Sequence, residues 1–155
     1  MTKLRGILLA LALVLVVAPR VIGPQETVTP SVITAPAAGL QDAVKPVTTL
    51  LKGHAQAAEL GYAYAALADT VQRDAGVIKT TRDFKEANTR FVTLRFAGIL
   101  TPKVPGLAAA IDQVLQQQIG LEVADLNKPR TDGTTLRASL VSALNAVAWA
   151  CLQAK

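Results

Sequence analysis

Apolar residues return every three or four positions through most of the chain after residue 38, and this spacing is the strongest constraint on its fold. Side chains at that spacing share one face of an α-helix, whereas a half-buried strand would alternate apolar and polar residues. No stretch of the sequence shows a convincing alternation of that kind. We therefore predict an all-α fold in which residues 39–155 form a small bundle of about four helices.

Local signals set the ends of the expected helices. The first should begin near Pro46, a favourable first-turn residue, and be closed by Gly76. Gly53 and Gly61 lie inside it and mark a bend or a close helix contact. The second opens at Thr80. The expected ranges are 46–74, 80–100, 105–120 and 134–153, with a short helical piece at 40–44 before the first.

The second helix carries the clearest cap signal, because Thr80 and Asp83 have the spacing of a capping box, with Asp in place of the usual Glu. Its buried face is expected to consist of Phe84, Ala87, Phe91 and Leu94, with Gly98 as the next position on that face. The corresponding positions in the last two helices are Leu107, Ile111, Val114, Leu115 and Ile119, then Leu136, Leu140, Leu144, Val147 and Cys151.

The N-terminus has the pattern of a targeting segment. A short basic region at residues 1–5 precedes an unbroken apolar run over residues 7–18. A helix of that length is about 18 Å long, short of the ~30 Å hydrocarbon core but typical of a secretory signal. Pro19 and Pro24 follow the candidate cleavage positions, where proline fits poorly in a protease-bound strand. Residues 1–23 are therefore either a signal peptide or a single-pass membrane anchor, and both alternatives stay open.

The flanking charges predict on which side of the membrane the domain lies. Lys3 and Arg5 precede the apolar run and outweigh Arg20 after it, so the N-terminus is expected in the cytoplasm. The remainder is then periplasmic or extracellular and membrane-anchored, or is secreted after cleavage. Residues 24–38 mix Pro, Thr and Val without a helical period, and we expect an extended linker there before the domain at 39–155.

The formal net charge of +5 does not predict nucleic-acid binding. Lys3, Arg5 and Arg20 belong to the targeting segment, which leaves 13 of the 16 Lys and Arg against 11 Asp and Glu. A phosphate-binding protein normally shows a larger clustered excess. We expect no nucleic-acid partner.

Few residues could carry chemistry. His54 is the only histidine and Cys151 the only cysteine, so a zinc site with several histidines is excluded. Cys151 lies on the expected apolar face of the last helix, where a buried and unreactive thiol is the commoner case. No glycine-rich phosphate loop occurs. We expect no catalytic, metal-binding or cofactor-binding residue, and no cofactor.

Segment 79–103 is the most basic part of the chain after the targeting region, with a net charge of +4. Glu86 is spaced to form i,i+4 ion pairs with Arg82 and Arg90. Asp69 and Arg73 have the same spacing. On a helix the cations spread over more than one face, which favours a solvated surface over a site for anionic lipid or wall polymer. The candidate contact residues are Lys79, Arg82, Lys85, Arg90, Arg95 and Lys103.

These observations favour one function and leave two alternatives. We expect an exported or membrane-anchored envelope protein whose bundle is a non-catalytic interaction or scaffold module for a protein partner. The first alternative is a small envelope hydrolase or lysis accessory protein that uses Cys151 or carboxylates. The weaker alternative is binding of anionic lipid or wall polymer through residues 79–103. Enzymatic activity is not expected.

Overall fold

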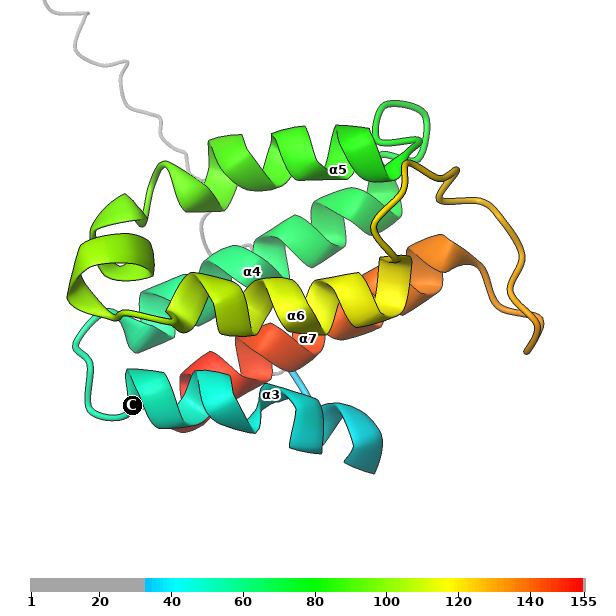
Figure 1. Cartoon of the computed structure of the whole chain (residues 1–155). Coiled ribbons are helices and arrows are strands. Elements are labelled where there is room, and N and C mark those ends of the chain that lie inside the picture. The colour runs from blue at the N-terminus through cyan, green and yellow to red at the C-terminus, as the bar shows by residue number, and fades with distance from the viewer. Residues whose placement is uncertain (1–32, 155) are drawn as a thin grey trace, which may run out of the picture. The chain divides into compact units, whose positions relative to one another are not determined.

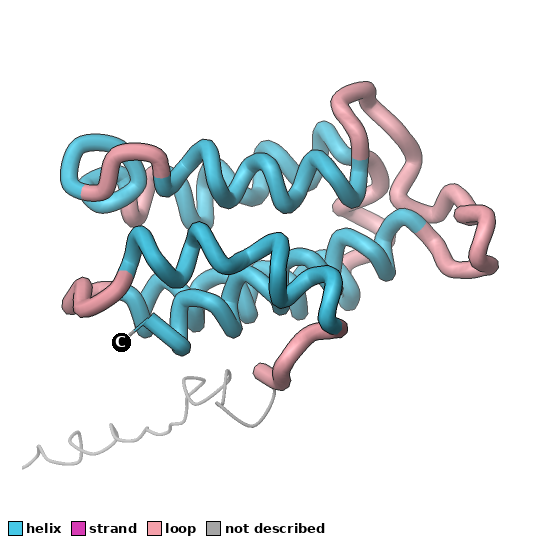
Figure 2. Tube along the Cα trace, turned by 60° about the horizontal axis from the view of Figure 1, so that its bottom comes forward, coloured by secondary structure: helices cyan, strands magenta, loops and turns pink. Residues whose placement is uncertain are grey.

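The computed structural model describes residues 33–154, with the side chains of residues 101 and 102 left out. The expected signal or anchor at 1–23 lies outside the described residues, as does most of the expected linker. Residues 33–37 form no helix, yet Ile33 is buried and so belongs to the core. Helices joined by loops make up the described residues, which contain no strand (Figures 1 and 2), and the all-α prediction is confirmed.

The described part of the chain contains five α-helices and two short π-helical segments. The count exceeds the expected four because the first expected helix is divided in two. The α-helices are α3 (Ala38–Leu51), α4 (Ala57–Arg73), α5 (Thr81–Asn88), α6 (Leu107–Ile119) and α7 (Leu136–Ala154), and the π-helical segments are η4 (Thr89–Thr93) and η5 (Ile99–Lys103).

α7 is the helix around which α3, α4 and α6 pack, since it contacts all three (Figure 1). Its five expected core positions are all buried, from Leu136 to Cys151. Alanines between them are buried as well, so α7 is enclosed over most of its circumference. Small side chains let neighbouring helices approach closely from several sides. The buried alanines are Ala143, Ala146, Ala148, Ala150 and Ala154.

The expected helix 46–74 is divided, so that prediction was wrong in its continuity and its start. α3 begins at Ala38 and holds Pro46 within it, on an exposed position where water can bond the backbone carbonyl that proline leaves unpaired. The chain leaves the helix at residues 52–56. Gly53 there has a φ of +75°, which favours glycine, and its N–H donates to the carbonyl oxygen of Ala154 at 2.9 Å. This bond joins the loop to the end of α7.

The two other glycine predictions for this region had different outcomes. Gly61 is buried against α7, as a close helix contact requires. Gly76 does not close α4, because that helix already ends at Arg73. The N–H of Asp74 instead bonds the carbonyl of Thr70 at 2.8 Å and completes the last turn.

The second expected helix is interrupted by a π turn. α5 ends at Asn88 and continues as η4, where the N–H of Leu94 donates to the carbonyl of Thr89, five residues back, at 3.0 Å. A π turn holds one more residue than an α turn would. Residues beyond it therefore move round the helix axis by about one position relative to a continuous α-helix.

This shift changes which side chains are buried. Ala87 precedes the π turn and is buried as expected, but Phe91 and Leu94 are 51% and 67% exposed, so their predicted burial was wrong. Val92 and Phe96 take the core positions. Residues 99 and 100 are buried as well as Val92 and Phe96. These four residues have more apolar surface than Phe91 and Leu94, and burying that surface favours the shifted register.

Two further details of the second helix differ from the prediction, because it was expected to end at residue 100 whereas η5 continues to Lys103, and Gly98 is exposed rather than buried. The predicted cap at Thr80, the apolar faces of the last two helices and the loop between them are confirmed. Thr80 caps α5, its Oγ1 accepting from the N–H of Asp83 while the Asp83 carboxylate accepts from the N–H of Thr80. α6 buries all five expected residues, from Leu107 to Ile119. Residues 121–133 form a loop, joined to its neighbours by isolated bridges rather than by a sheet.

A buried arginine joins α7 to the end of α4. Arg137 is only 8% exposed, and its Nη1 donates to the carbonyl oxygen of Val71 at 2.7 Å. That carbonyl belongs to the last turn of α4, where the aligned peptide dipoles place partial negative charge. The guanidinium therefore has a structural role as a helix C-terminal cap.

Candidate functional site

All six basic residues expected to contact an anionic surface are exposed, and none of them forms an ion pair with a described residue. Asp69 pairs with Arg73 at 2.7 Å, as expected. Glu86 pairs with neither Arg82 nor Arg90, so those two predicted pairs do not form. The six cations are therefore exposed charges with no carboxylate of a described residue within ion-pair distance.

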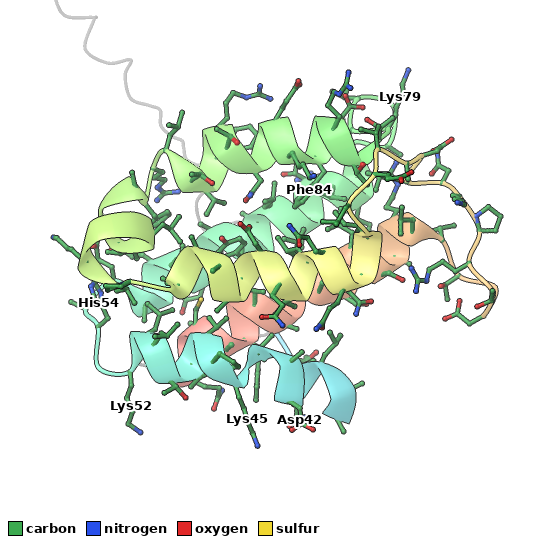
Figure 3. All side chains as sticks on the ribbon, viewed as in Figure 1. Asp42, Lys45, Lys52, His54, Lys79 and Phe84 are labelled. Atoms are coloured by element: carbon green, nitrogen blue, oxygen red, sulfur yellow. The ribbon has the colours of Figure 1, made fainter. Side chains whose placement is uncertain are left out.

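The structure does not gather the six into one cluster. Lys79 precedes α5 and lies at the opposite end of the bundle from His54 (Figure 3), while Lys103 ends η5. Arg90 and Arg95 are adjacent in sequence to the exposed apolar residues Phe91 and Leu94 at the π turn. We define the π-turn patch as Arg90, Phe91, Leu94 and Arg95.

Contacts at the π turn bring the π-turn patch together. Phe91 and Arg95 border the same groove on α4, and Leu94 immediately precedes Arg95. The Arg90 guanidinium carbon lies 5.5 Å from the centre of the Phe91 ring, and that of Arg95 lies 5.1 Å from the ring of Phe96. These distances are within the range of cation–π attraction. Along the chain, the two large apolar residues of the patch thus lie between its two cations.

A shallow groove adjoins the patch. Its floor is formed by α4, from Ala63, Ala66, Leu67 and Thr70, and the side chains of Phe91 and Arg95 close its other side. Its volume is about 160 Å³. The groove extends the exposed apolar surface from the π turn onto α4.

One carboxylate near these cations, that of Asp83, is engaged in the N-terminal cap of α5. Asp83 accepts hydrogen bonds from the backbone N–H groups of Lys79 at 2.9 Å and Thr80 at 3.0 Å. The bonds from these two N–H groups lower the pKa of Asp83, and the Thr80 hydroxyl and the Lys79 charge lower it further. The Asp83 carboxylate therefore stays ionised but is directed at the backbone.

Cys151 and His54 do not form a catalytic pair in this structure. Burial raises the pKa of the Cys151 thiol to about 12, so the nucleophilic thiolate is not formed near neutral pH. The Nδ1 of His54 accepts from the N–H of Gln56 at 3.2 Å within the loop after α3. No hydrogen bond joins His54 to Cys151, both of which the structure describes.

The described residues contain neither a membrane-spanning helix nor a cluster of metal ligands. None of the helices between residues 33 and 154 is long and apolar enough to span a membrane. Those residues also contain no group of three or more His, Cys, Asp or Glu side chains that could hold a metal ion.

Sequence reasoning missed the part of the site that is apolar. Phe91 and Leu94 were assigned to the core, and the only signal against this was the competing apolar set that includes Val92 and Phe96.

No family model matches the chain, and comparisons with curated proteins and with solved structures find no match either.

Proposed function

We propose that residues 33–155 are a non-catalytic binding domain and that its π-turn patch attaches to the anionic surface of the membrane at which residues 1–23 deliver or hold the chain. The observation that supports this most is the exposure of Phe91 and Leu94 between two arginines that have no carboxylate partner. This arrangement favours the lipid alternative over the wall polymer, since a hydrated polymer offers no apolar phase to receive the two side chains.

The charges supply the long-range part of the attraction. Segment 79–103 has a net charge of +4, and each Lys or Arg near an anionic bilayer contributes about 1 kcal/mol. Because the six cations are exposed and form no ion pairs, their charge is available to lipid phosphates. The attraction should decline as salt screens it.

The apolar side chains supply the short-range part. The side chains of Phe91 and Leu94 are exposed to water in the folded domain, which is unfavourable for apolar surface. Burying them at the boundary between headgroups and acyl chains would remove this unfavourable contact with water. Arginine side chains can bury their stems while the guanidinium stays among the headgroups. Arg90 and Arg95 have the positions to do so on either side of Phe91 and Leu94.

Vesicle co-sedimentation of residues 33–155 tests the proposal, once cooperative unfolding shows that the fragment folds alone. We expect binding to vesicles of phosphatidylcholine with phosphatidylglycerol, weaker binding at high salt, and little binding to phosphatidylcholine alone. Replacing both Arg90 and Arg95 with Gln removes about 2 kcal/mol, roughly a 30-fold loss of affinity. Phe91→Ser with Leu94→Ser should cost about tenfold or more.

The matched control removes two charges elsewhere. Lys45 lies on α3 and Lys52 just after it, on the side of the bundle away from α5 (Figure 3). Replacing both with Gln changes the net charge by the same amount as the double arginine variant. If the control weakens binding as much as the loss of Arg90 and Arg95, net charge alone drives binding and the proposed patch is wrong.

A protein partner is the second candidate, and one observation favours it. Exposed aromatic and arginine side chains beside a groove are typical of the centres of protein interfaces, where such anchors fill pockets. Here the groove on α4 adjoins Phe91 and Arg95. The absence of any binding to anionic vesicles at low salt would leave this candidate in place of the lipid surface.

A further inference from the structure

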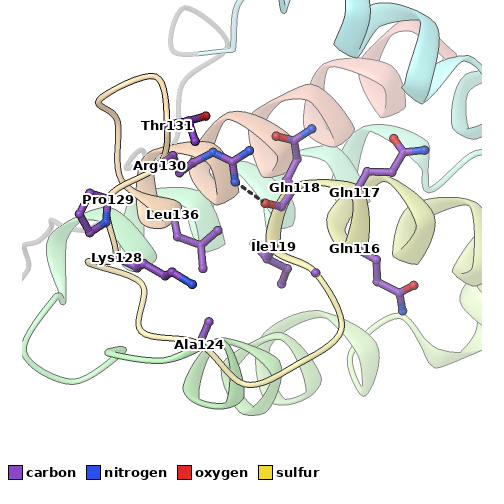
Figure 4. Close-up of a pocket in the computed structure, with 11 residues that line it drawn as sticks. Gln116, Gln117, Gln118, Ile119, Ala124, Lys128, Pro129, Arg130, Thr131 and Leu136 are labelled. Atoms are coloured by element: carbon purple, nitrogen blue, oxygen red, sulfur yellow. Dashed lines mark hydrogen bonds between the residues drawn. The ribbon is translucent and has the colours of Figure 1, made fainter.

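A separate hollow lies at the far end of α6, away from the π turn. It is an open hollow bordered by the last turn of α6, the loop at 124–131 and the first residue of α7, and its volume is about 450 Å³ (Figure 4). Sites for small molecules usually begin at about 300 Å³. The size therefore suits a small organic molecule.

The lining combines an apolar wall with positive charge. Ile119 and Leu136 are buried residues whose side chains face the hollow, and the Lys128 side chain reaches in between them and Ala124 (Figure 4). Arg130 stands at its edge. None of the residues that line the hollow is acidic, and the Lys128 amine has no hydrogen-bond or ion-pair partner among the described residues.

Arg130 retains donors for a ligand. Its Nη1 donates to the carbonyl oxygen of Gln118 at 2.9 Å, which satisfies the C-terminus of α6, and the guanidinium has four further N–H groups. Asp132, the acid that follows in the loop, does not line the hollow. Its carboxylate accepts from the N–H and the hydroxyl of Thr134 at 3.0 and 2.7 Å.

The loop is held in place by its backbone, so the hollow exists before a ligand binds. The carbonyl of Lys128 accepts from the N–H of Leu136 at 2.9 Å, and its N–H donates to the carbonyl of Asp125 at 3.1 Å. The N–H of Arg130 donates to the carbonyl of Thr134 at 2.6 Å. A preformed site loses less entropy on binding.

We propose that this hollow binds a small amphiphilic carboxylate. The carboxylate accepts hydrogen bonds from the Lys128 amine, which has no partner among the described residues, and from N–H groups of Arg130 that are not taken up by the Gln118 carbonyl. The hydrocarbon part packs on Ile119 and Leu136. The site lies on different elements from the π-turn patch and does not depend on the proposed lipid attachment.

Hexanoate is the probe, titrated against the full chain held in nanodiscs of phosphatidylcholine, with the methyl signals of Ile119 and Leu136 followed by NMR. We expect saturable shifts of both signals. Hexanol, which has no charge, should shift them far less. Lys128→Gln should weaken hexanoate binding at least about tenfold, as loss of a charged hydrogen bond does.

Two further variants make the result decisive. Lys52→Gln removes a charge outside the hollow and should leave hexanoate binding unchanged. Ala124→Leu fills the hollow from its half-buried wall and should abolish saturation even if Lys128 is intact. Equal binding of hexanol and hexanoate, an unaffected Lys128→Gln variant, or shifts that never saturate would each overturn the proposal.

Discussion

Gly61 of α4 lies so close to α7 that a Cβ atom there would be 2.9 Å from the carbonyl oxygen of Ala148. The same atom would lie 3.1 Å from the Cβ of Cys151. Gly61→Ala therefore forces the two helices apart, and we expect a loss of about 1–3 kcal/mol in the free energy of unfolding, measured with urea. Gly98→Ala is the control, because its Cβ meets open space and its helical φ suits alanine. That change should stabilise by about 0.4–1 kcal/mol. Equal effects of the two substitutions would contradict the close contact.

Phe91, within the π turn, and Phe96, just beyond it, should respond differently to truncation. Phe96 is buried, and Phe96→Ala should cost about 3–5 kcal/mol. Phe91 is half exposed, and Phe91→Ala should stay within about 0.5–1 kcal/mol of the parent protein. A continuous α-helix would reverse this order, so the two unfolding free energies test the register directly.

The contribution of the capping box to the free energy of unfolding can be measured by replacing Thr80. Thr80→Ala removes the acceptor for the N–H of Asp83 and should reduce stability by about 0.5–2 kcal/mol. Thr80→Ser keeps the hydroxyl and should retain most of that stability. Because hydrogen bonds lower the pKa of Asp83, the parent should also lose stability as the pH falls below about 4 and the carboxylate becomes protonated.

Alkaline pH should destabilise the bundle through two buried groups. Burial raises the pKa of Cys151 to about 12 and also raises that of Tyr64, while in an unfolded chain they ionise near about 8.5 and 10. The unfolded state therefore loses protons first, and the free energy of unfolding should fall as the pH rises above 8.5. Each group contributes at most about 1.4 kcal/mol per pH unit. Urea midpoints from pH 7 to 11 measure this.

Removing the thiol separates the two contributions. Cys151→Ala should flatten the decline between pH 8.5 and 10 and leave the later decline due to Tyr64. If the parent and the variant show the same pH dependence, Cys151 is not held neutral by burial. Alkylation of Cys151 by iodoacetamide should likewise be slow in the native protein and fast after unfolding.

Much of the fold could be predicted from sequence where a single apolar face had no competitor. The faces of α6 and α7 and the cap at Thr80 are of this kind, because spacing and side-chain chemistry point to one answer. From sequence, Gly53 could mark either a bend or a close helix contact. Only its hydrogen bond to Ala154 shows that the helix ends before it. That bond joins residues 101 positions apart, which no local pattern contains.

The candidate sites could be predicted only in part. The basic residues of segment 79–103 were identified, but Phe91 and Leu94 were placed in the core because a regular period assumes an unbroken α-helix. Two apolar sets compete there, and tertiary packing selects the one that needs a π turn.

Lys128 and Arg130 had no signal in sequence, since their hollow exists only when the loop folds against α6.

The central position of α7 also affects when the protein can fold. Ribosomes release a chain from its N-terminus onward, so α3, α4 and α6 emerge before the helix that all three contact. Until residues 136–154 follow, their apolar faces have no common partner, and neither the Gly53 N–H nor the Val71 carbonyl has its hydrogen-bond partner on α7. Nascent chains shorter than this should remain sensitive to protease, and tertiary structure should form only after synthesis has passed α7.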